Sequence, residues 1–359
     1  MNINEKHLQE LSEKYDVPYI DVLLITLNRY GISLKDTEEK RIRFKFKVKN
    51  YNEIFYLAIC VNTFDNTPFE LVGTDILFNG EKIGDVIDRE KDTCDTTYFR
   101  RHRTELTLNS NARSQCKGCK FCGTYNQDPD DENQLDTEEK LSAHIEKTLK
   151  QYGMKDLSEV LRCTVCTGCF PEEEKLIDHL AMVRRTLAKY GFNKKIRYIG
   201  SQIRSAEGLE RIKNEVAPFS LSLTTECFSN REKLMRNEKA SLSKEKSIEL
   251  LDKARELGFA ANILYILGLD ELDVFEENMR EYAPHFNRFP VVQVMQNYLA
   301  SQEQYRVKEA AEDVEYYLKA RKILEDIFKD TDLKPRTWEN YRSVFYTTYQ
   351  GKKNETFKI

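Results

Sequence analysis

The residues of this chain with the clearest chemical potential are six cysteines in two short runs. Nine cysteines occur in 359 residues, and six of them lie in the segments CKGCKFC and CTVCTGC, namely Cys116, Cys119, Cys122, Cys163, Cys166 and Cys169. Cysteines at such spacings, in a chain that begins without a secretory signal, are typical of metal ligands rather than of disulfides. Three thiolates from one loop suit an iron–sulfur cluster that keeps a fourth position open.

Composition and charge argue against several functional classes of protein. Lys and Arg number 56 and Asp and Glu number 60, giving a formal charge of -4, and the two signs are interspersed. A nucleic-acid partner is not expected because no basic stripe occurs. No run approaches the ~20 apolar residues of a membrane span. The polar N-terminus MNINEKHLQEL argues against secretion, so a cytoplasmic location is expected.

The first part of the chain, residues 1–98, is predicted to be a small α+β domain. Residues 1–36 show helical spacing of apolar residues, and the segment 41–48 (RIRFKFKV) alternates basic and apolar residues as a strand does. Further strands are expected in YLAICV, ELVGTDILF and FNGEKIGDVI, where Asn79-Gly80 is a hairpin signal. This unit is expected to recognise or cover the substrate.

From residue 99 to 330 strands and helices alternate. The strands expected are ELTLNSN, EVLRCTVC, KKIRYIGS, FSLSLTTE, FAANILYILG and VVQVMQNYL, each followed by a helical pattern. Six βα units predict a parallel sheet covered by helices, whose chemistry lies at the carboxyl ends of the strands. The first cysteine run follows the strand 105–111 at such an end. An aromatic-rich segment, residues 331–359, closes the chain, and packing against the barrel is favoured for it over a lid.

The loop TLNSNARSQCKGCKFCGTYN resembles the cluster loop of the radical S-adenosylmethionine (radical SAM) superfamily. The usual loop reads Cys-x-x-x-Cys-x-aromatic-Cys after the first strand of a partial (β/α)6 barrel. Cys119-Lys120-Phe121-Cys122 matches its second half, whereas the first spacing is one residue short. The fold that the resemblance implies is a partial (β/α)6 radical SAM barrel at 99–330, preceded by the small α+β domain.

The resemblance also implies cofactors and partners. Cys116, Cys119 and Cys122 would ligate a [4Fe–4S] cluster, and S-adenosylmethionine (SAM) would bind the open iron. Reductive cleavage of SAM would yield a 5′-deoxyadenosyl radical that abstracts a substrate hydrogen. Reduced flavodoxin or ferredoxin would donate the electron.

Cofactor-binding residues are predicted at three further strand ends by the same resemblance. They are Thr167, Gly168, Glu226, Lys246, Ile266 and Gly268. Thr167 and Gly168 would meet the methionine amino group, Glu226 the ribose, Lys246 the SAM carboxylate, and Ile266 and Gly268 the adenine. Two alternatives stay open: a cap or an Arg231 ion pair for Glu226, and a solvated helix face for Lys246.

The three cysteines of the second run could ligate an auxiliary iron–sulfur cluster, but strand geometry argues against this. Side chains alternate faces along a strand, so Cys163 and Cys166 are expected on opposite sides of the sheet. Cys169 follows the strand at the barrel mouth, where it is a candidate hydrogen-atom donor, with simple packing as the alternative. His179 lies within a helical pattern and is expected at the surface or at a boundary.

The leading functional hypothesis is therefore a radical SAM enzyme. An exposed edge strand at 41–48 would pair with an extended peptide, which favours modification of a ribosomally made precursor peptide. The alternatives are a radical SAM enzyme acting on a small metabolite and a zinc-stabilised binding module. Zinc would need a fourth Cys or His close to the loop.

Overall fold

The computed structural model describes residues 3–35, 37–64, 67–91, 97–111, 118–123, 134–170, 172–336 and 342–354. Cys94, Cys116, Trp338 and Tyr341 therefore lie outside the described residues. Within the described ranges, no helix is long and apolar enough to cross a membrane.

The N-terminal unit consists of two helices and a five-stranded antiparallel sheet. Its elements are α1 (Glu5–Tyr15), α2 (Tyr19–Tyr30), β1 (Arg41–Val48), β2 (Ile54–Cys60), β3 (Phe69–Val72), β4 (Asp75–Phe78) and β5 (Glu81–Lys91). The apolar residues of β1 share one buried face, as the alternation predicts: Ile42, Phe44, Phe46 and Val48. The predicted hairpin is also confirmed, because Asn79 and Gly80 join β4 to β5 with φ of 50° and 86°.

The structure contradicts two expectations for this sheet. Its strand order is β2-β1-β5-β4-β3, so β1 is paired on both sides and is not an exposed edge strand. Residues 70–78, predicted as one strand, form two strands that reverse at Gly73, where φ is 61°. Edge position depends on which strands pair across the sheet, and hydrophobic alternation within one strand carries no such information.

The second sheet has seven strands in the order β12-β11-β10-β9-β8-β7-β6. They are β6 (Tyr98–Arg100), β7 (Glu105–Asn111), β8 (Arg162–Thr167), β9 (Lys195–Gly200), β10 (Phe219–Glu226), β11 (Ala260–Leu267) and β12 (Val291–Val294). Strands β7 to β12 are parallel neighbours in chain order, and β6 is antiparallel to β7. This singly wound, open sheet is the predicted partial (β/α)6 barrel.

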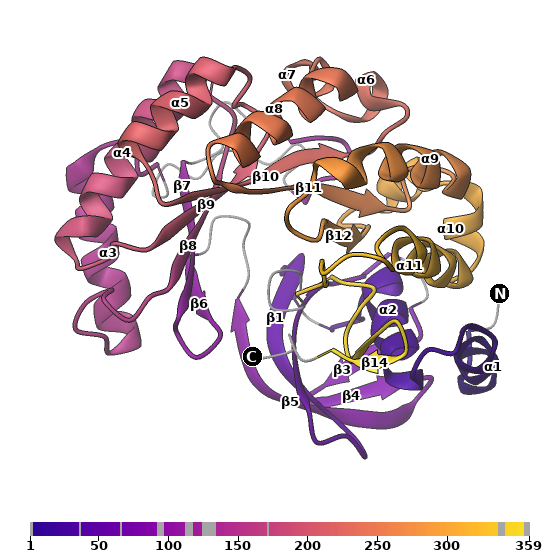
Figure 1. The fold of residues 1–359 in the computed structure, drawn as a ribbon. Helices are drawn as coiled ribbons and strands as arrows, with labels where there is room; N and C mark the ends of the chain where they lie inside the picture. Colours follow the sequence, from indigo (N-terminus) through magenta and orange to yellow (C-terminus); the bar gives the residue numbers. More distant parts are fainter. Residues whose placement is uncertain are drawn as a thin grey trace.

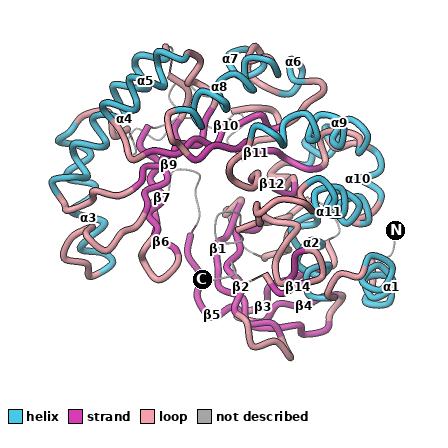
Figure 2. Tube along the Cα trace, viewed as in Figure 1, coloured by secondary structure: helices cyan, strands magenta, loops and turns pink. Residues whose placement is uncertain are grey.

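Helices cover one face of the curved sheet. The crossover helices are α3 (Glu138–Tyr152), α4 (Glu173–Lys189), α5 (Ala206–Glu215), α8 (Lys244–Glu256) and α9 (Leu272–Tyr282). The predicted N-cap of α3 is confirmed, because the Thr137 hydroxyl accepts a bond from the Lys140 amide. Two short helices, α6 (Arg231–Leu234) and α7 (Asn237–Ala240), intervene before α8, and α10 (Lys308–Glu312) and α11 (Glu315–Ile327) follow β12. Figures 1 and 2 show the helices outside the sheet and the N-terminal unit across from them, on its inner side.

The two faces of the barrel sheet differ as alternation requires. Residues such as Leu106, Cys163 and Ile196 are buried in the main hydrophobic core. Their neighbours Thr107, Thr164 and Arg197 line the barrel interior instead. Polar residues therefore recur on the inner face of β7 and β8, whereas Ile199 of β9 is an apolar inner residue.

The N-terminal unit and the C-terminal segment are tied to the barrel by buried polar contacts. Asp21 of α2 accepts bonds from Arg321 of α11 (2.6 Å) and from the Tyr346 and Thr347 amides (3.1 and 2.9 Å). Gln296, just after β12, donates to Asn28 and to the Ala58 carbonyl, each at 3.1 Å. The described C-terminal residues 342–354 thus pack against the barrel and α2, as favoured from the sequence.

Candidate functional site

A cavity of about 270 Å³ occupies the interior of the half-barrel. Its wall comes from inward-facing residues of all seven strands of the barrel sheet. Arg41 from β1 and Arg342 from the C-terminal segment also line the cavity. The open side of the barrel is therefore bordered by the N- and C-terminal parts of the chain.

The first cysteine loop reaches this cavity at the carboxyl end of the strands. Cys122 lines the cavity, and Cys119 is buried beside it in an apolar cluster with Phe121. Gln302 holds the loop by donating to the carbonyls of Lys120 (2.8 Å) and Cys122 (3.1 Å). Cys116, the third predicted ligand, lies outside the described residues, so the complete ligand set stays a prediction.

Glu226 and Lys239 form an ion pair at the same end of the cavity, which we call the mouth. The Lys239 ammonium donates to Glu226 Oε2 at 3.0 Å, and the Cys119 thiol lies 4.0 Å from the same oxygen. Both Glu226 and Lys239 line the cavity. Glu226 has φ of 64° at an irregularity in the β10–β11 pairing, a left-handed conformation that is uncommon for a residue with a side chain. Strain of this kind is found preferentially at functional sites.

The partner of Glu226 differs from the alternative considered on the sequence. Arg231 does not pair with it. The Arg231 guanidinium donates to the carbonyls of Thr225 (2.6 Å), Cys227 (2.9 Å) and Lys239 (2.9 Å). Arg231 therefore stabilises the connection between α6 and α7, and Lys239 in α7 lies at the cavity.

The electrostatics of the mouth keep Cys119 protonated when no cation is bound. Burial raises the pKa of the Cys119 thiol to about 12, although Lys239 opposes this effect. For Lys239, desolvation works against the charged form, but Glu226 and the thiols of Cys119 and Cys169 raise its pKa well above its ordinary value. The mouth thus holds a neutral thiol next to a balanced ion pair.

Only two of the six predicted cofactor residues line the cavity: Glu226 and Ile266. Thr167 ends β8, and its hydroxyl is hydrogen-bonded to Tyr198 behind the cavity wall. Gly168 is buried after β8 and does not line the cavity. Lys246 is on the outer side of α8, where its ammonium pairs with Glu249 at 2.7 Å and its side chain is 39% exposed. Lys239, and not Lys246, is among the residues that line the cavity.

Gly268 has a different environment from the one predicted. Its φ is 110°, and a Cβ there would meet the Arg306 guanidinium and the Tyr317 hydroxyl, each at 3.1 Å. Gly268 thus lies against a buried polar network, and a larger side chain would disturb that network rather than the cavity. Glu271 is exposed at the start of α9.

The second cysteine run is split by the sheet as strand alternation predicts. Cys163 is fully buried in the core under the helices, whereas Cys166 lines the cavity. Cys169 is buried beyond the strand end and does not line the cavity. Its role as hydrogen-atom donor stays a prediction.

His179 is not at the surface, so the expectation from the sequence was wrong. It is 6% exposed, packs against Phe170, and its Nε2 is 2.7 Å from the Ser110 hydroxyl near the end of β7. Burial lowers the pKa of His179 to about 4, so the ring is neutral near pH 7. Helical periodicity missed this because α4 buries a wide face against the sheet and its neighbours.

The amino end of the strands forms a floor rich in arginine. Here we call Arg100, Arg162 and Arg197 the arginine floor; all three line the cavity. Arg162 pairs with Glu105 at 2.7 Å. Arg197 is 1% exposed and donates to the Ser222 hydroxyl at 3.0 and 2.8 Å.

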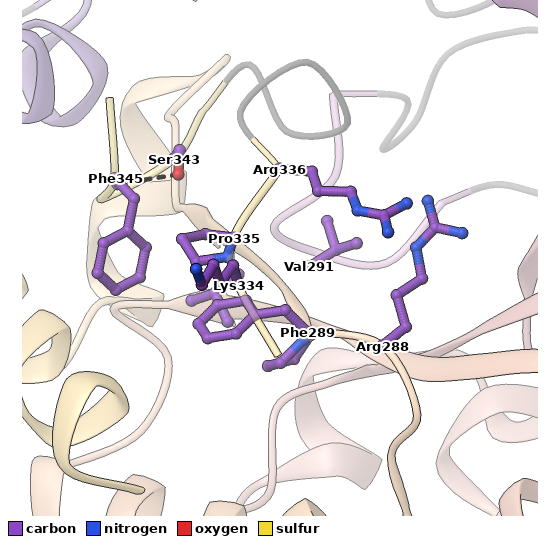
Figure 3. A pocket seen from close by; sticks show the side chains of 10 residues that line it. Arg288, Phe289, Val291, Lys334, Pro335, Arg336, Ser343 and Phe345 are labelled. Carbon is purple, nitrogen blue, oxygen red and sulfur yellow. Dashed lines mark hydrogen bonds between the residues drawn. The ribbon is translucent and has the colours of Figure 1, made fainter. Parts of the chain in front are cut away.

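Two more arginines line a small hollow of about 20 Å³ next to the start of β12. Figure 3 shows the side chains of Arg288 and Arg336 reaching the same region. Burial, and after it the charges of Arg197 and Arg162, lower the pKa of Arg288 well below its ordinary value. The positive charge of the floor therefore extends beyond the cavity wall.

Comparisons with known proteins give similarity only at the level of structure. No family model and no curated protein matches the sequence. Streptococcus suis SuiB is similar over 64% of this chain and 46% of its own, with 13% identity and a TM-score of 0.41. Its complex with the precursor peptide SuiA is also similar, over 64% of this chain and 47% of that one, with 13% identity and a TM-score of 0.40.

The FeFe-hydrogenase maturase HydG from Carboxydothermus hydrogenoformans is similar over 66% of this chain and 55% of its own. The identity is 15% and the TM-score is 0.41. A structure of SuiB bound to S-adenosylmethionine is also similar, over 57% of this chain and 43% of that one, with 13% identity and a TM-score of 0.38. This chain spans about half the length of these proteins.

Lys239 and the arginine floor were missed on the sequence, although a signal for the floor was present. Glu105 and Arg162 each begin an alternation of inner residues such as Thr107 and Thr164 with buried outer residues in a predicted barrel strand, and Arg197 lies on the inner face of the next one. In a barrel of parallel strands, polar residues at every second position face the interior. No comparable signal marks Lys239, which reaches the cavity from a four-residue helix.

Proposed function

We propose that this chain is a radical SAM enzyme that uses a [4Fe–4S] cluster and SAM. The observation that carries the proposal is the position of Cys119 and Cys122. They follow β7 at the carboxyl end of an open, singly wound sheet, beside the cavity inside it. Ligands of parallel α/β sheets bind at this end of the strands.

The described residues suit a cluster in their donor chemistry. Cys119 and Cys122 offer two thiols from one turn, closed by a 2.8 Å bond from the Cys122 amide to the Cys119 carbonyl. No group of three or more potential ligands occurs among the residues that the structure describes, so a full set needs another residue. Cys116 is the ligand that the spacing supplies. A buried thiol with a raised pKa becomes a thiolate when a metal displaces its proton.

The chain's own groups can hold SAM at the mouth. When bound, the cluster supplies the electron that cleaves the SAM sulfonium, after reduction by flavodoxin or ferredoxin. Glu226 has two acceptor oxygens suited to the ribose hydroxyls. Lys239 provides the cation for the SAM carboxylate in place of Lys246, and Ile266 offers an apolar wall for the adenine. The strands that line the cavity would shield a reactive intermediate from bulk water on the barrel side.

The substrate class we favour is a small molecule that fits inside the barrel. Modification of a precursor peptide was favoured from the sequence because exposed edge strands, such as the one expected at residues 41–48, could pair with it; β1, the strand given as the example, is interior. The edges of the described N-terminal sheet are β2 and β3; Ser33 exchanges backbone bonds with Phe69 and Leu71 of β3, and Gln296 donates to the Ala58 carbonyl of β2. A peptide remains a candidate if one of its side chains, rather than its extended backbone, enters the cavity.

Anaerobic reconstitution with iron and sulfide tests the proposal. We expect a brown protein whose broad visible absorbance fades on reduction and which forms 5′-deoxyadenosine from SAM. A colourless protein that retains zinc after reconstitution would contradict the proposal and support the zinc-stabilised binding module instead.

A further inference from the structure

The cavity is strongly asymmetric in charge along the barrel. Among its described lining residues, six carry positive side chains and two carry carboxylates. At the mouth, Lys239 is balanced by Glu226 at 3.0 Å. Toward the floor, Glu105 is the carboxylate among the described residues that line the cavity. Its charge interacts with all three arginines of the floor and with Arg101, which lies outside the cavity.

The floor places these cations in an environment that favours an added anion. Arg162 and Arg197 are 6% and 1% exposed, and burial of like charges is costly. Burial, and after it the Arg162 charge, lower the pKa of Arg197 to about 9. Desolvation raises the pKa of Glu105 although Arg162 and Arg101 oppose this. One more negative charge at the floor would lower the electrostatic cost of both guanidinium groups.

The floor is also held in place before any ligand binds. The Ser222 hydroxyl, which accepts from Arg197, donates to Asn262 Oδ1 at 2.6 Å. Asn262 in turn donates to the Phe289 carbonyl at 2.6 Å. This chain of bonds crosses three adjacent strands and orients the guanidinium. Arginine presents paired N–H donors that match the oxygens of a carboxylate or a phosphoryl group.

We propose that the arginine floor, Arg100, Arg162 and Arg197, binds a carboxylate or phosphoryl group of a ligand that occupies the barrel cavity. Interpreting that ligand as the substrate rests on the proposed function; binding of the anion does not. Arg162 and Cys166 are four residues apart on β8, about 13 Å at the usual rise per residue. An anionic group at the floor therefore leaves the rest of a small molecule extending toward the cysteine loop.

The test uses the full chain without cluster or SAM, with inorganic phosphate and succinate as probes. Binding is measured by calorimetry, and thermal unfolding is followed in parallel. We expect at least one of the two anions to bind saturably and to weaken with rising ionic strength, and the tighter of the two identifies the group that the floor prefers. Arg197→Gln and Arg100→Gln should each weaken binding by about tenfold or more, as loss of a charge-assisted bond implies.

Matched variants separate a binding role from a structural one. Arg255→Gln, on the outer side of α8, should bind the anions as the wild type does. Arg100 is half-buried on the short strand β6, so Arg100→Gln should fold even if Arg197→Gln does not. Glu105→Gln should tighten binding, because it removes the carboxylate that competes for Arg162. No saturable binding of either anion, or unchanged affinity in folded Arg100→Gln, would overturn the proposal.

A competition experiment distinguishes this anion site from the SAM site. SAM should not displace the bound anion, since the mouth and the floor lie at opposite ends of the cavity. Competitive displacement by SAM would overturn the assignment to substrate and place the SAM carboxylate at the floor. Anion binding by a chain that never forms 5′-deoxyadenosine would refute the proposed function and leave the anion site standing.

Discussion

The two ends of the barrel cavity differ in how their buried charges are balanced. At the mouth, one ammonium and one carboxylate neutralise each other at 3.0 Å beside a protonated thiol. At the floor, guanidinium groups from β6, β8 and β9 face Glu105 of β7. The mouth suits a metal cation that converts thiols to thiolates, and the floor suits an anion. One cavity therefore offers sites for two chemically different ligands.

Removing a thiol at the mouth should have the largest effect. Cys119→Ala or Cys122→Ala should abolish both cluster assembly and 5′-deoxyadenosine formation, because a three-thiolate site loses a ligand. Cys116→Ala should do the same. Iron content and product formation after anaerobic reconstitution measure both effects. Cys60→Ala, which removes a buried thiol outside the cavity, is the matched control and should keep both; a loop variant that still assembles a SAM-cleaving cluster would refute the ligand assignment.

The folded chain should also lose stability in acid because of His179. The folded chain takes up this proton only near pH 4, whereas the unfolded chain does so near 6.5. Between these values the unfolded state binds more protons, so stability falls as pH falls, by about 3 kcal/mol in all. Urea unfolding at pH 7 and pH 4.5 measures the loss. In His179→Gln this component of the pH dependence should vanish; an unchanged slope would show that other groups cause it.

Loss of Glu226 should affect the mouth selectively. Charge-assisted hydrogen bonds contribute about 1.5–3 kcal/mol, so Glu226→Ala should weaken SAM binding by roughly ten- to a hundredfold. The cluster should still assemble, because no thiolate is removed. SAM affinity is read from the perturbation of the EPR signal of the reduced cluster. Glu271→Ala, at an exposed carboxylate, is the control; equal affinities of the two variants would exclude Glu226 from the SAM site.

The smallest effect is expected for the second cysteine run. A single [4Fe–4S] cluster implies about four irons per chain. Cys163→Ala and Cys166→Ala should leave that count unchanged, since the two thiols lie on opposite faces of β8. A count near eight that falls when Cys163, Cys166 or Cys169 is replaced would establish an auxiliary cluster. It would also mean that the strand end rearranges when metal binds.

Much of the fold could be predicted from the sequence because its signals are local. The period-two alternation in RIRFKFKV and ELTLNSN, the turn at Asn79-Gly80 and the cap at Thr137 each depend on neighbours within a few residues. The position of the cysteine loop followed from its place directly after a strand. The domain boundaries at 98 and 330 stay predictions, and buried contacts such as Asp21 to Arg321 join the units across them.

The site residues were predicted less well because most depend on distant partners. Lys246 has the composition and helix position expected for a carboxylate ligand, yet it pairs with Glu249 on the outside of α8. Lys239 reaches Glu226 because Arg231 holds the intervening connection through backbone carbonyls. Nothing within a few residues of Lys239 distinguishes it from the many exposed lysines of the chain.

The sequence by itself determined the order of strands and helices, the two faces of each strand and the place of the thiols at a strand end. These properties follow from steric and hydrophobic preferences that act over a few residues. Only the tertiary structure decided that β1 is interior, that His179 is buried and that arginines of three strands form one floor. Those facts depend on strand pairing and sheet curvature, which bring together residues that are far apart in the chain.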